Sequence, residues 1–334
     1  MLTRPAGLSD ELLAGALRAG WDLAPITAEY QPLGFGSHHW HVTAENGAAW
    51  FVTVDELTTR LRTAGDTRDA AYRRLGQALQ TARALSGTGA SFVVAPVRTA
   101  AGDVLTRIGD EYAVAVYPYV TGQAGRWGDT VTPAERQAIV SLLTRVHAAP
   151  ETVWAGAGRD DFLLAGADNL RGALGDLARA WDSGPHAEPA RRLLARHARD
   201  LEAMLARRDR LAGQARARPE RLVLTHGEPH PGNLIRAGRQ WMLIDWDTVL
   251  VAPPERDLWH LDPGDGSIAA SYRELTGREI LASGLDLYRQ TWLLADITSS
   301  VAGLRREHGD TWDARMEWEI LTASLTQGGY GNGD

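Results

Sequence analysis

Three oxygen-bearing side chains stand at a fixed spacing in the C-terminal half of the chain. From Leu224 the sequence reads Leu-Thr-His-Gly-Glu-Pro-His-Pro-Gly-Asn-Leu-Ile, and after a short insert it continues Met-Leu-Ile-Asp-Trp-Asp. Glu228 precedes Asn233 by five residues, and Asp245 ends an apolar run that is typical of a strand. Carboxylate and amide oxygens are ligands for Mg²⁺, and a further carboxylate can orient an attacking hydroxyl. Phosphoryl transfer needs this set of groups.

Each of these side chains has an assignment and a plainer alternative. We expect Glu228 to be the catalytic carboxylate, and Asn233 and Asp245 to be the Mg²⁺ ligands. The alternatives are a solvated loop glutamate, a loop asparagine and a turn residue that ends the strand. His226 is grouped with the catalytic residues because its hydrogen bonds are expected to shape the loop. Asp247 is expected to begin the following turn, and a second metal ligand is its alternative. The order and spacing of the whole block favour the phosphoryl-transfer interpretation.

The block resembles a known family. The pattern His-Gly-Asp-x-x-x-x-Asn, followed by an Ile-Asp pair that closes a strand, marks the aminoglycoside phosphotransferases, which share the protein-kinase-like fold. The matching residues here are His226, Gly227, Glu228, Asn233, Ile244 and Asp245. Asp257, in Pro-Pro-Glu-Arg-Asp-Leu, resembles the family's buried aspartate that supports the catalytic loop. In general the chain is similar to the spectinomycin phosphotransferase branch. Glu228 departs from the family's usual aspartate and is longer by one CH₂ group.

The resemblance implies an α+β, two-lobed protein-kinase-like fold. A small N-terminal lobe over residues 1–119 would contain an antiparallel sheet plus a helix and would bind the nucleotide. A larger, mainly helical lobe over residues 120–327 would contain the catalytic and substrate-binding residues. Residues 328–334, which are rich in glycine, are expected to form a disordered tail.

Periodicity and turn residues predict elements in that order. A helix capped by Ser9 is expected over residues 10–20, and Thr132-Pro133-Ala134-Glu135 is a typical helix start. Strands are expected at Ile26–Leu33, His39–Ala44, Trp50–Val54, Val104–Ile108 and Tyr112–Tyr117, with a helix at Asp66–Leu85 after the third. Further helices are expected from 133 to about 147 and over residues 160–181, 188–216, 254–260, 267–276, 284–307 and 312–325.

Two segments are expected to contact the nucleotide. Gly34, Gly36 and Ser37 lie between the first two expected strands, where glycine lets backbone N–H groups approach phosphate oxygens; a plain turn is the alternative. Tyr117-Pro118-Tyr119-Val120 occupies the position where the family hydrogen-bonds adenine through backbone groups, and a plain connector is the alternative. Proline has no N–H group. The remaining candidates there are Tyr117, Tyr119 and Val120.

The third expected strand departs most from the family. The resemblance implies a lysine that binds the α- and β-phosphates and pairs with a glutamate on the next helix. Thr53 stands in the lysine's place, and residues 66–85 contain no glutamate. Losing both members together avoids leaving one charge buried alone. Either an arginine reaches the phosphates, for which Arg60, Arg62 and Arg73 are candidates, or the site has lapsed and only binds nucleotide.

Acidic side chains in the last helices are candidates for contact with an amine-bearing substrate, because relatives bind amines in this way. Asp286 and Asp296 are the main candidates, with Glu317 and Glu319 further along the chain. Each is alternatively a surface charge. Asp296 follows the apolar run Trp292–Ala295, so it is expected to face inward.

Composition narrows the classes of function. The 334 residues include no cysteine, and all 35 basic residues are arginine. This excludes disulfides and thiolate metal sites, and also Walker-A loops and Schiff-base enzymes, which need lysine. A formal net charge of −7 disfavours a nucleic-acid partner and suits a cationic substrate. There is no apolar run long enough for a membrane span and no layout of a secretion signal, so we expect a cytoplasmic enzyme.

Together these features predict an ATP- and Mg²⁺-dependent small-molecule kinase. Its acceptor would be a hydroxyl of a small cationic sugar-like molecule, such as spectinomycin or an aminoglycoside, which would make it an antibiotic-resistance enzyme. GTP in place of ATP stays open. The alternatives are a metabolite kinase of a biosynthetic pathway and a catalytically silent, pseudokinase-like nucleotide-binding module.

Overall fold

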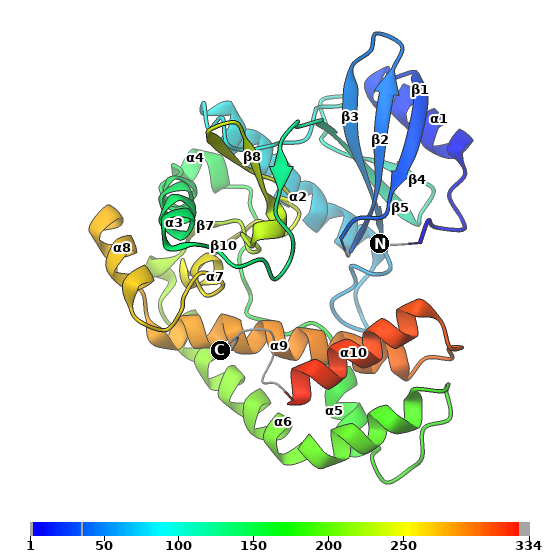
Figure 1. Cartoon of the computed structure of the whole chain (residues 1–334), viewed down its shortest axis with the longest axis vertical. Coiled ribbons are helices and arrows are strands. Elements are labelled where there is room, and N and C mark those ends of the chain that lie inside the picture. The colour runs from blue at the N-terminus through cyan, green and yellow to red at the C-terminus, as the bar shows by residue number, and fades with distance from the viewer. Residues whose placement is uncertain (1–2, 35, 327–334) are drawn as a thin grey trace.

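A five-stranded antiparallel sheet forms the N-terminal part of the protein, in a computed structural model that describes residues 3–34 and 36–326. The strands lie in the order β1-β2-β3-β5-β4. Helix α1 (Asp10–Trp21) packs on one face, and α2 (Arg68–Gly87) follows β3 (Figure 1). The strands are β1 Pro25–Gln31, β2 Ser37–Ala44, β3 Ala49–Glu56, β4 Thr106–Ile108 and β5 Tyr112–Pro118.

The alternation of side chains along β3 decides which of its residues face the helical part of the molecule. Val52 and Val54 pack in a core cluster with residues of α1. Successive strand residues point to opposite faces. Thr53 and Asp55 therefore lie on the other face, where Phe51 packs in a second cluster with residues of α2.

The rest of the chain is mainly helical, with α6, α9 and α10 lying below the sheet in the view of Figure 1. Short strands support the loops between helices: β7 pairs with β10, and β6, β8 and β9 form a three-stranded sheet. The helices are α3 Pro133–His147, α4 Glu151–Trp154, α5 Ala167–Gly175, α6 Ala187–Arg216, α7 Glu255–Leu258, α8 Ser267–Thr276, α9 Ala282–Leu304 and α10 Trp312–Thr326. The short strands are β6 Gln123–Ala124, β7 Val223–Thr225, β8 Leu234–Ala237, β9 Gln240–Leu243 and β10 Leu250–Ala252.

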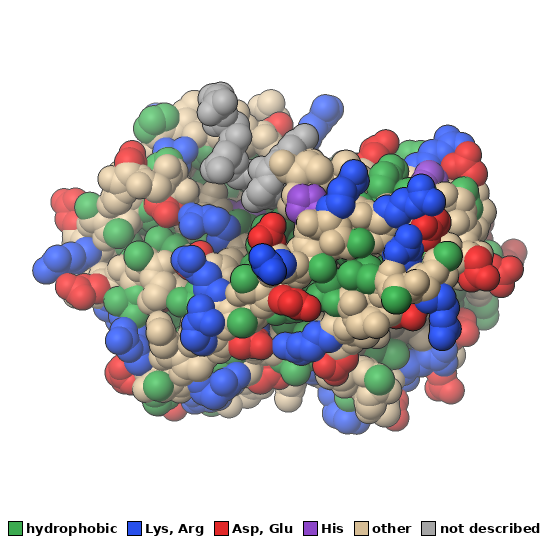
Figure 2. Space-filling model, turned by 90° about the horizontal axis from the view of Figure 1, so that it is seen from below, with side chains coloured by type: hydrophobic (Ala, Val, Ile, Leu, Met, Phe, Trp, Pro, Cys, Tyr) green, Lys and Arg blue, Asp and Glu red, His purple; other side chains and the backbone are tan. Residues whose placement is uncertain are grey.

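The structure confirms the predicted α+β class and the order of strands and helix in the N-terminal part. It also confirms the cap of α1 by Ser9 and the start of α3, where Thr132 and Glu135 form a capping box. The boundary after residue 119 stays a prediction, and the predicted tail 328–334 lies outside the described residues. In the described part of the chain, no helix is long and apolar enough to cross a membrane. Acidic and basic side chains are interspersed on the face shown in Figure 2.

The helix predicted over residues 160–181 is wrong at both ends. α5 spans only Ala167–Gly175, and an irregular segment precedes it. The Asp160 carboxylate accepts a hydrogen bond from the backbone N–H of Phe162 at 2.7 Å, a local bond that competes with helix formation. Phe162 and Gly166 have φ values of 56° and 73°, outside the right-handed helical region. The helical spacing of apolar residues in this stretch is therefore overridden by local side-chain hydrogen bonding.

Candidate active site

A buried carboxylate holds the loop that connects β7 to β8. Asp257 of α7 accepts hydrogen bonds from the backbone N–H groups of His226 at 2.9 Å and Gly227 at 2.6 Å. His147 of α3 lies 3.0 Å from the same carboxylate. Burial alone would raise the pKa of Asp257, but the hydrogen bond and charge of His147, together with the charges of His226 and Arg256, outweigh burial and leave that pKa below its ordinary value. Asp257 is therefore ionised, and it fixes the start of the loop.

The His226 imidazole joins this loop to the segment that contains Asp245. Its Nδ1 accepts a hydrogen bond from the backbone N–H of Glu228 at 3.2 Å. Nε2 must then carry the proton, and it donates to the carbonyl of Ile244 at 2.8 Å. Burial lowers the pKa of His226 and keeps the ring neutral. With both nitrogens engaged, this side chain positions the loop.

Three carboxyl groups and a guanidinium meet beside this loop. Burial, and then the charges of Asp247 and Glu228, raise the pKa of Asp245 well above its ordinary value. Burial and the charge of Asp247 likewise raise the pKa of Glu228 to about 7. Asp247 itself forms an ion pair with Arg60 at 2.5 Å. Carboxyl groups that resist ionisation in this way would be stabilised by a cation placed between them.

The oxygen atoms of Asn233, Asp245 and Asp247 suit a hard cation such as Mg²⁺. Nδ2 of Asn233 donates to the carbonyl of Glu228 at 2.9 Å, which leaves the amide oxygen for another ligand. Asp245 has a positive φ of 63°, a strained conformation of the kind that concentrates at functional sites. Within the described residues, no three His, Asp or Glu side chains converge as a complete metal site. Mg²⁺ does not need one, because it binds through one or two carboxylates, phosphate oxygens and water.

The glycine-rich turn and the third strand lie on the sheet side of this group. Gly34 and Gly36 have φ values of 60° and 93°, which glycine adopts without steric cost. Ser37 begins β2, and its hydroxyl donates to Oδ1 of Asp55 on β3 at 2.6 Å. Thr53 forms a hydrogen bond with the buried Tyr117 hydroxyl. Contact of these residues with a nucleotide stays a prediction.

The backbone N–H group of one hinge candidate, Tyr119, already has a partner in the sheet. The N–H group of Tyr119 donates to the carbonyl of Ala49 at 3.3 Å, and its ring is exposed. Tyr117 and Val120 pack in an apolar cluster whose side chains come from both the N-terminal part and the mainly helical part of the chain. The members of this cluster next to the carboxyl groups are Tyr117, Val120, Met242 and Ile244. They are candidates to enclose a nucleotide base.

Only one of the three arginines suggested by the sequence reaches the carboxyl groups. Nη2 of Arg60, in the segment between β3 and α2, lies 2.5 Å from Oδ1 of Asp55 and 2.5 Å from Oδ2 of Asp247. Arg62 pairs instead with a carboxylate of the helical part at 2.6 Å. Arg73 is exposed on α2. Arg60 is therefore the remaining candidate to replace the absent lysine.

An aromatic cluster includes a residue of the loop, His230, together with Trp127, His260 and Trp292. Trp127 stacks on Trp292 with 5.1 Å between ring centroids. It meets the imidazoles of His230 and His260 edge-on at 4.5 and 5.4 Å. Asp296, one turn beyond Trp292 on α9, is close enough for its charge to raise the pKa of Glu228. Burial raises the pKa of Asp296 itself to about 6, so an ammonium group would stabilise its ionised form.

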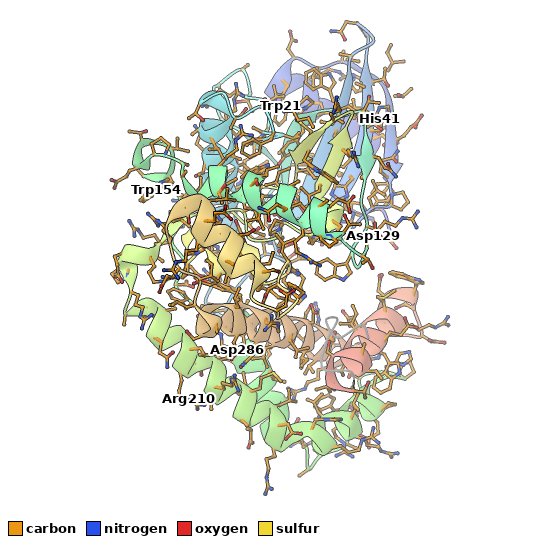
Figure 3. The ribbon with its side chains drawn as sticks, turned by 60° about the vertical axis from the view of Figure 1, so that its left-hand side comes forward. Trp21, His41, Asp129, Trp154, Arg210 and Asp286 are labelled. Carbon is orange, nitrogen blue, oxygen red and sulfur yellow. The ribbon has the colours of Figure 1, made fainter. Side chains whose placement is uncertain are left out.

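Asp286 has its ion-pair partner on another helix. It forms an ion pair with Arg207 of α6 at 2.5 Å, and Figure 3 shows it on the side of α9 that faces α6. In this structure the side chain of Asp286 joins two helices, and its contact with a substrate stays an untested prediction. The sequence does not indicate which neighbour a charge on a helix surface will meet.

Several residues of the site were missed by the sequence analysis. Asp247 begins a turn as expected, and it also pairs with Arg60, a contact that the sequence does not indicate. Asp55 was not predicted as a site residue, because the family has a basic side chain and not a carboxylate in this part of the third strand. Trp127, His230 and His260 come from separate segments without a local pattern, so only the fold brings them together.

The sheet, the loop and its carboxyl groups define a small-molecule phosphotransferase of the kinase-like class. The chain belongs to the phosphotransferase enzyme family, whose model matches residues 29–292. Protein StrN of Streptomyces griseus is 31% identical over 259 residues, which cover 73% of this chain and 74% of that protein.

Two solved structures share the fold at low sequence identity. Spectinomycin phosphotransferase APH(9)-Ia in complex with ADP and spectinomycin has a TM-score of 0.73 at 15% identity, over 97% of this chain and 96% of that chain. Amicoumacin kinase hAmiN in complex with AMP-PNP, Ca²⁺ and Ami has a TM-score of 0.59 at 13% identity, over 98% and 97% of the two chains. Family membership and fold together make this chain an enzyme that transfers a phosphoryl group to a small molecule.

Proposed function

We propose that this enzyme transfers the γ-phosphoryl group of ATP, with Mg²⁺, to a hydroxyl of a small cationic sugar-like molecule. The observation that supports this most is the position of Glu228. The charges of both Asp247 and Asp296 act on its carboxyl group, so Glu228 lies within electrostatic reach of the proposed metal-binding groups and of the proposed amine-binding group. A carboxylate near both is suited to orient an acceptor hydroxyl toward a phosphate.

Asn233 and Asp245 are the proposed Mg²⁺ ligands, with Asp247 beside them. When bound, Mg²⁺ neutralises charge on the nucleotide phosphates. The chain's own contribution is to hold these oxygens in place, which it does through Asp257, His226 and the hydrogen bond from Asn233 to the loop. The nucleotides present in the two solved structures support a nucleotide at the corresponding place.

Glu228 is the proposed catalytic residue. Its carboxylate accepts the hydrogen bond of the acceptor hydroxyl and holds the oxygen in line with the phosphate. The raised pKa of about 7 suits a group that must also take up the proton when the bond to phosphorus forms. The additional CH₂ of glutamate, relative to the family's usual aspartate, places the hydroxyl farther from the loop backbone.

The aromatic cluster and Asp296 form the proposed acceptor site. A flat aromatic surface next to a carboxylate favours a molecule that has an apolar ring face and an ammonium group. Spectinomycin and the aminoglycosides combine such features, and the likeness to a spectinomycin phosphotransferase supports them as first candidates. Phosphorylation of such an antibiotic in the cytoplasm, where ATP is available, would confer resistance.

The test is incubation of the purified protein with MgATP and a panel led by spectinomycin and several aminoglycosides, read by mass spectrometry. The control is Asp245→Asn, because asparagine tolerates a positive φ and preserves the backbone. A phosphorylated antibiotic that disappears in the control supports the proposal. A product found only with metabolite amino alcohols would favour the metabolite kinase. Nucleotide binding without any product would contradict catalysis and favour the silent module.

A further inference from the structure

We propose that Arg60 binds the nucleotide phosphates in place of the strand lysine that this chain lacks, by exchanging Asp247 for a phosphate oxygen when the nucleotide enters. This inference rests on the proposed function, because it requires phosphates beside Asp245 and Asp247. It also explains why lysine and glutamate of the family's ion pair are both absent.

The position of Arg60 is fixed from β3. Its Nε and Nη2 atoms lie 2.9 and 2.5 Å from Oδ1 of Asp55. Asp55 is only 2% exposed and stands two residues beyond Thr53 on the same face of the strand. Two residues from the position of the family's lysine, β3 thus provides the buried carboxylate of Asp55. This carboxylate holds the Arg60 guanidinium over the same face of the strand.

The guanidinium also reaches the other groups that would surround a phosphate. Nη2 lies 2.5 Å from Oδ2 of Asp247 and 3.2 Å from the hydroxyl of Ser37, which directly follows the glycine-rich turn. These contacts use Nε and Nη2. Within the described part of the chain, Nη1 makes no hydrogen bond, and the side chain is 20% exposed. The Nη1 side of the guanidinium is therefore available to donate a hydrogen bond to an oxygen of an anion such as phosphate.

The acidic groups around the site would repel a triphosphate unless a cation balances their charge. Arg60 is placed to do so, because it already pairs with two of them. The other arginine near Glu228, Arg256, is already hydrogen-bonded to a hydroxyl at 2.9 Å and a carbonyl at 2.8 Å. With a cation bound beside Asp247, Asp55 would still hold Arg60, and the guanidinium would be available to donate hydrogen bonds to phosphate oxygens. The acidic groups concerned are Asp55, Glu228, Asp245 and Asp247.

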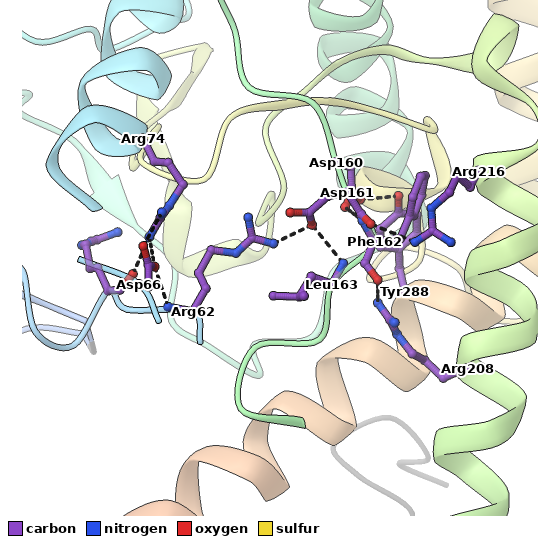
Figure 4. Close-up of polar contacts among 11 residues, drawn as sticks. Arg62, Asp66, Arg74, Asp160, Asp161, Phe162, Leu163, Arg208, Arg216 and Tyr288 are labelled. Atoms are coloured by element: carbon purple, nitrogen blue, oxygen red, sulfur yellow. Dashed lines mark hydrogen bonds and ion pairs between the residues drawn. The ribbon is translucent and has the colours of Figure 1, made fainter. Parts of the chain in front are cut away.

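The segment that contains Arg60 is held by both parts of the molecule, as Figure 4 shows for its flanking residues. Arg74 of α2 donates to the carbonyl of Arg60 at 3.0 Å and pairs with Asp66 at 2.5 Å. Arg62 pairs with Asp161 of the helical part at 2.6 Å. Arg74 of α2 thus supports the backbone of Arg60, while Asp55 of β3 holds its guanidinium. The cation of the site therefore comes from the segment between β3 and α2, and not from the strand itself.

Isothermal titration of the wild-type protein and of Arg60→Ala with MgATP, ADP and adenosine tests this role without requiring the acceptor. We expect Arg60→Ala to weaken MgATP binding about 10- to 100-fold, the range for a hydrogen bond to a charged group, and to leave adenosine binding unchanged. Arg60→Lys keeps the charge but loses the forked geometry, so it should restore part of the loss. Arg73→Ala, which removes an exposed arginine of α2, is the matched control and should bind as wild type.

The outcomes separate this inference from the proposed function. Equal weakening of MgATP and adenosine would show that Arg60 only supports the fold, and unchanged MgATP binding would show that it does not touch the phosphates; either result overturns the inference and leaves the kinase function standing. A wild-type protein that binds no nucleotide would overturn the proposed function itself. If Arg60→Ala does not fold, the comparison of MgATP with adenosine in Arg60→Lys decides the question, because thermal unfolding can confirm that variant is native.

Discussion

At the scale of single residues, the chemistry depends on carboxyl groups whose surroundings differ although they lie close together. Asp257 is ionised because hydrogen-bond donors surround it, whereas burial and neighbouring charge raise the pKa values of Asp245 and Glu228. Asp257 therefore positions the loop, whereas Asp245 and Glu228 are suited to bind a cation or a proton.

Replacement of Glu228 by glutamine tests the catalytic assignment. The amide of the new side chain cannot take the proton of the acceptor, although it fills the same space. We expect Glu228→Gln to lower kcat by about 10²- to 10⁴-fold while MgATP affinity stays the same. Steady-state kinetics and titration calorimetry on the same preparation would measure both. A kcat close to that of the wild type would remove Glu228 from the catalytic role.

Asp245→Asn tests the metal assignment. Because asparagine keeps the size and tolerates the positive φ of 63°, the fold should survive. We expect the gain in nucleotide affinity on adding Mg²⁺ to disappear, while affinity without metal is retained or improves through loss of a negative charge. Titration of ATP with and without MgCl₂ gives both quantities. A variant that still responds to Mg²⁺ like the wild type would show that the ion binds elsewhere.

At the scale of elements, the catalytic loop is shaped by contacts from helices distant in sequence. His147 of α3 and Asp257 of α7 form one chain of hydrogen bonds with the loop backbone, and Tyr272 of α8 extends it at 2.9 Å from His147. Gly227 is required at the centre of this arrangement. Its φ is 105°, and a Cβ atom there would overlap the guanidinium of Arg256.

Gly227→Ala should therefore destabilise the protein more than an alanine at an ordinary turn glycine. We expect a loss of about 2–3 kcal/mol in the free energy of unfolding, measured by urea denaturation. The matched control is Gly238→Ala at the β8–β9 turn, where φ is 62° and open space surrounds the new Cβ; the expected loss there is about 1 kcal/mol. Equal losses would mean that Arg256 does not pack against Gly227 as described.

At the scale of the whole molecule, the sheet and the helical part are joined through charged side chains, and three partly buried histidines are held in the neutral form. The pairs Arg60–Asp247 and Arg62–Asp161 connect the segment after β3 to the helical part. Burial lowers the pKa of His39 and His230 to about 4 and that of His260 to about 3. These rings fold in the neutral form, and protonation opposes folding.

The contribution of these three histidines to stability should consequently fall as the pH falls below 6.5, the ordinary histidine pKa, whereas the raised pKa values of Glu228 and Asp296 act in the opposite direction. Between that value and the lowered folded pKa values the histidines of the unfolded chain bind more protons, so their contribution rises with pH in this window. For His260 alone the effect at pH 5 is on the order of 2 kcal/mol. We expect His260→Phe to lose correspondingly less stability between pH 7 and pH 5, by urea denaturation. The same loss in variant and wild type would show that His260 is accessible to protons when folded.

The sequence by itself determined the class of fold, the catalytic loop and the family, because these depend on local patterns. Alternating apolar residues form strands, Ser9 and Thr132 cap helices, and Glu228, Asn233 and Asp245 lie within one short stretch. Even the departure from the family, a strand without its lysine, was visible in the sequence.

Only the tertiary structure decided which distant side chains share a site. Nothing local indicates that Arg60 meets Asp247, which follows it by 187 residues, or that Asp286 pairs with α6 while Asp296, on the same helix, lies near Glu228. The face on which a side chain lies can be inferred from periodicity, but its partner depends on how the elements pack. Because charges in a site act over a few ångströms of space, the chemistry of Arg60 and the aromatic cluster is a property of the fold.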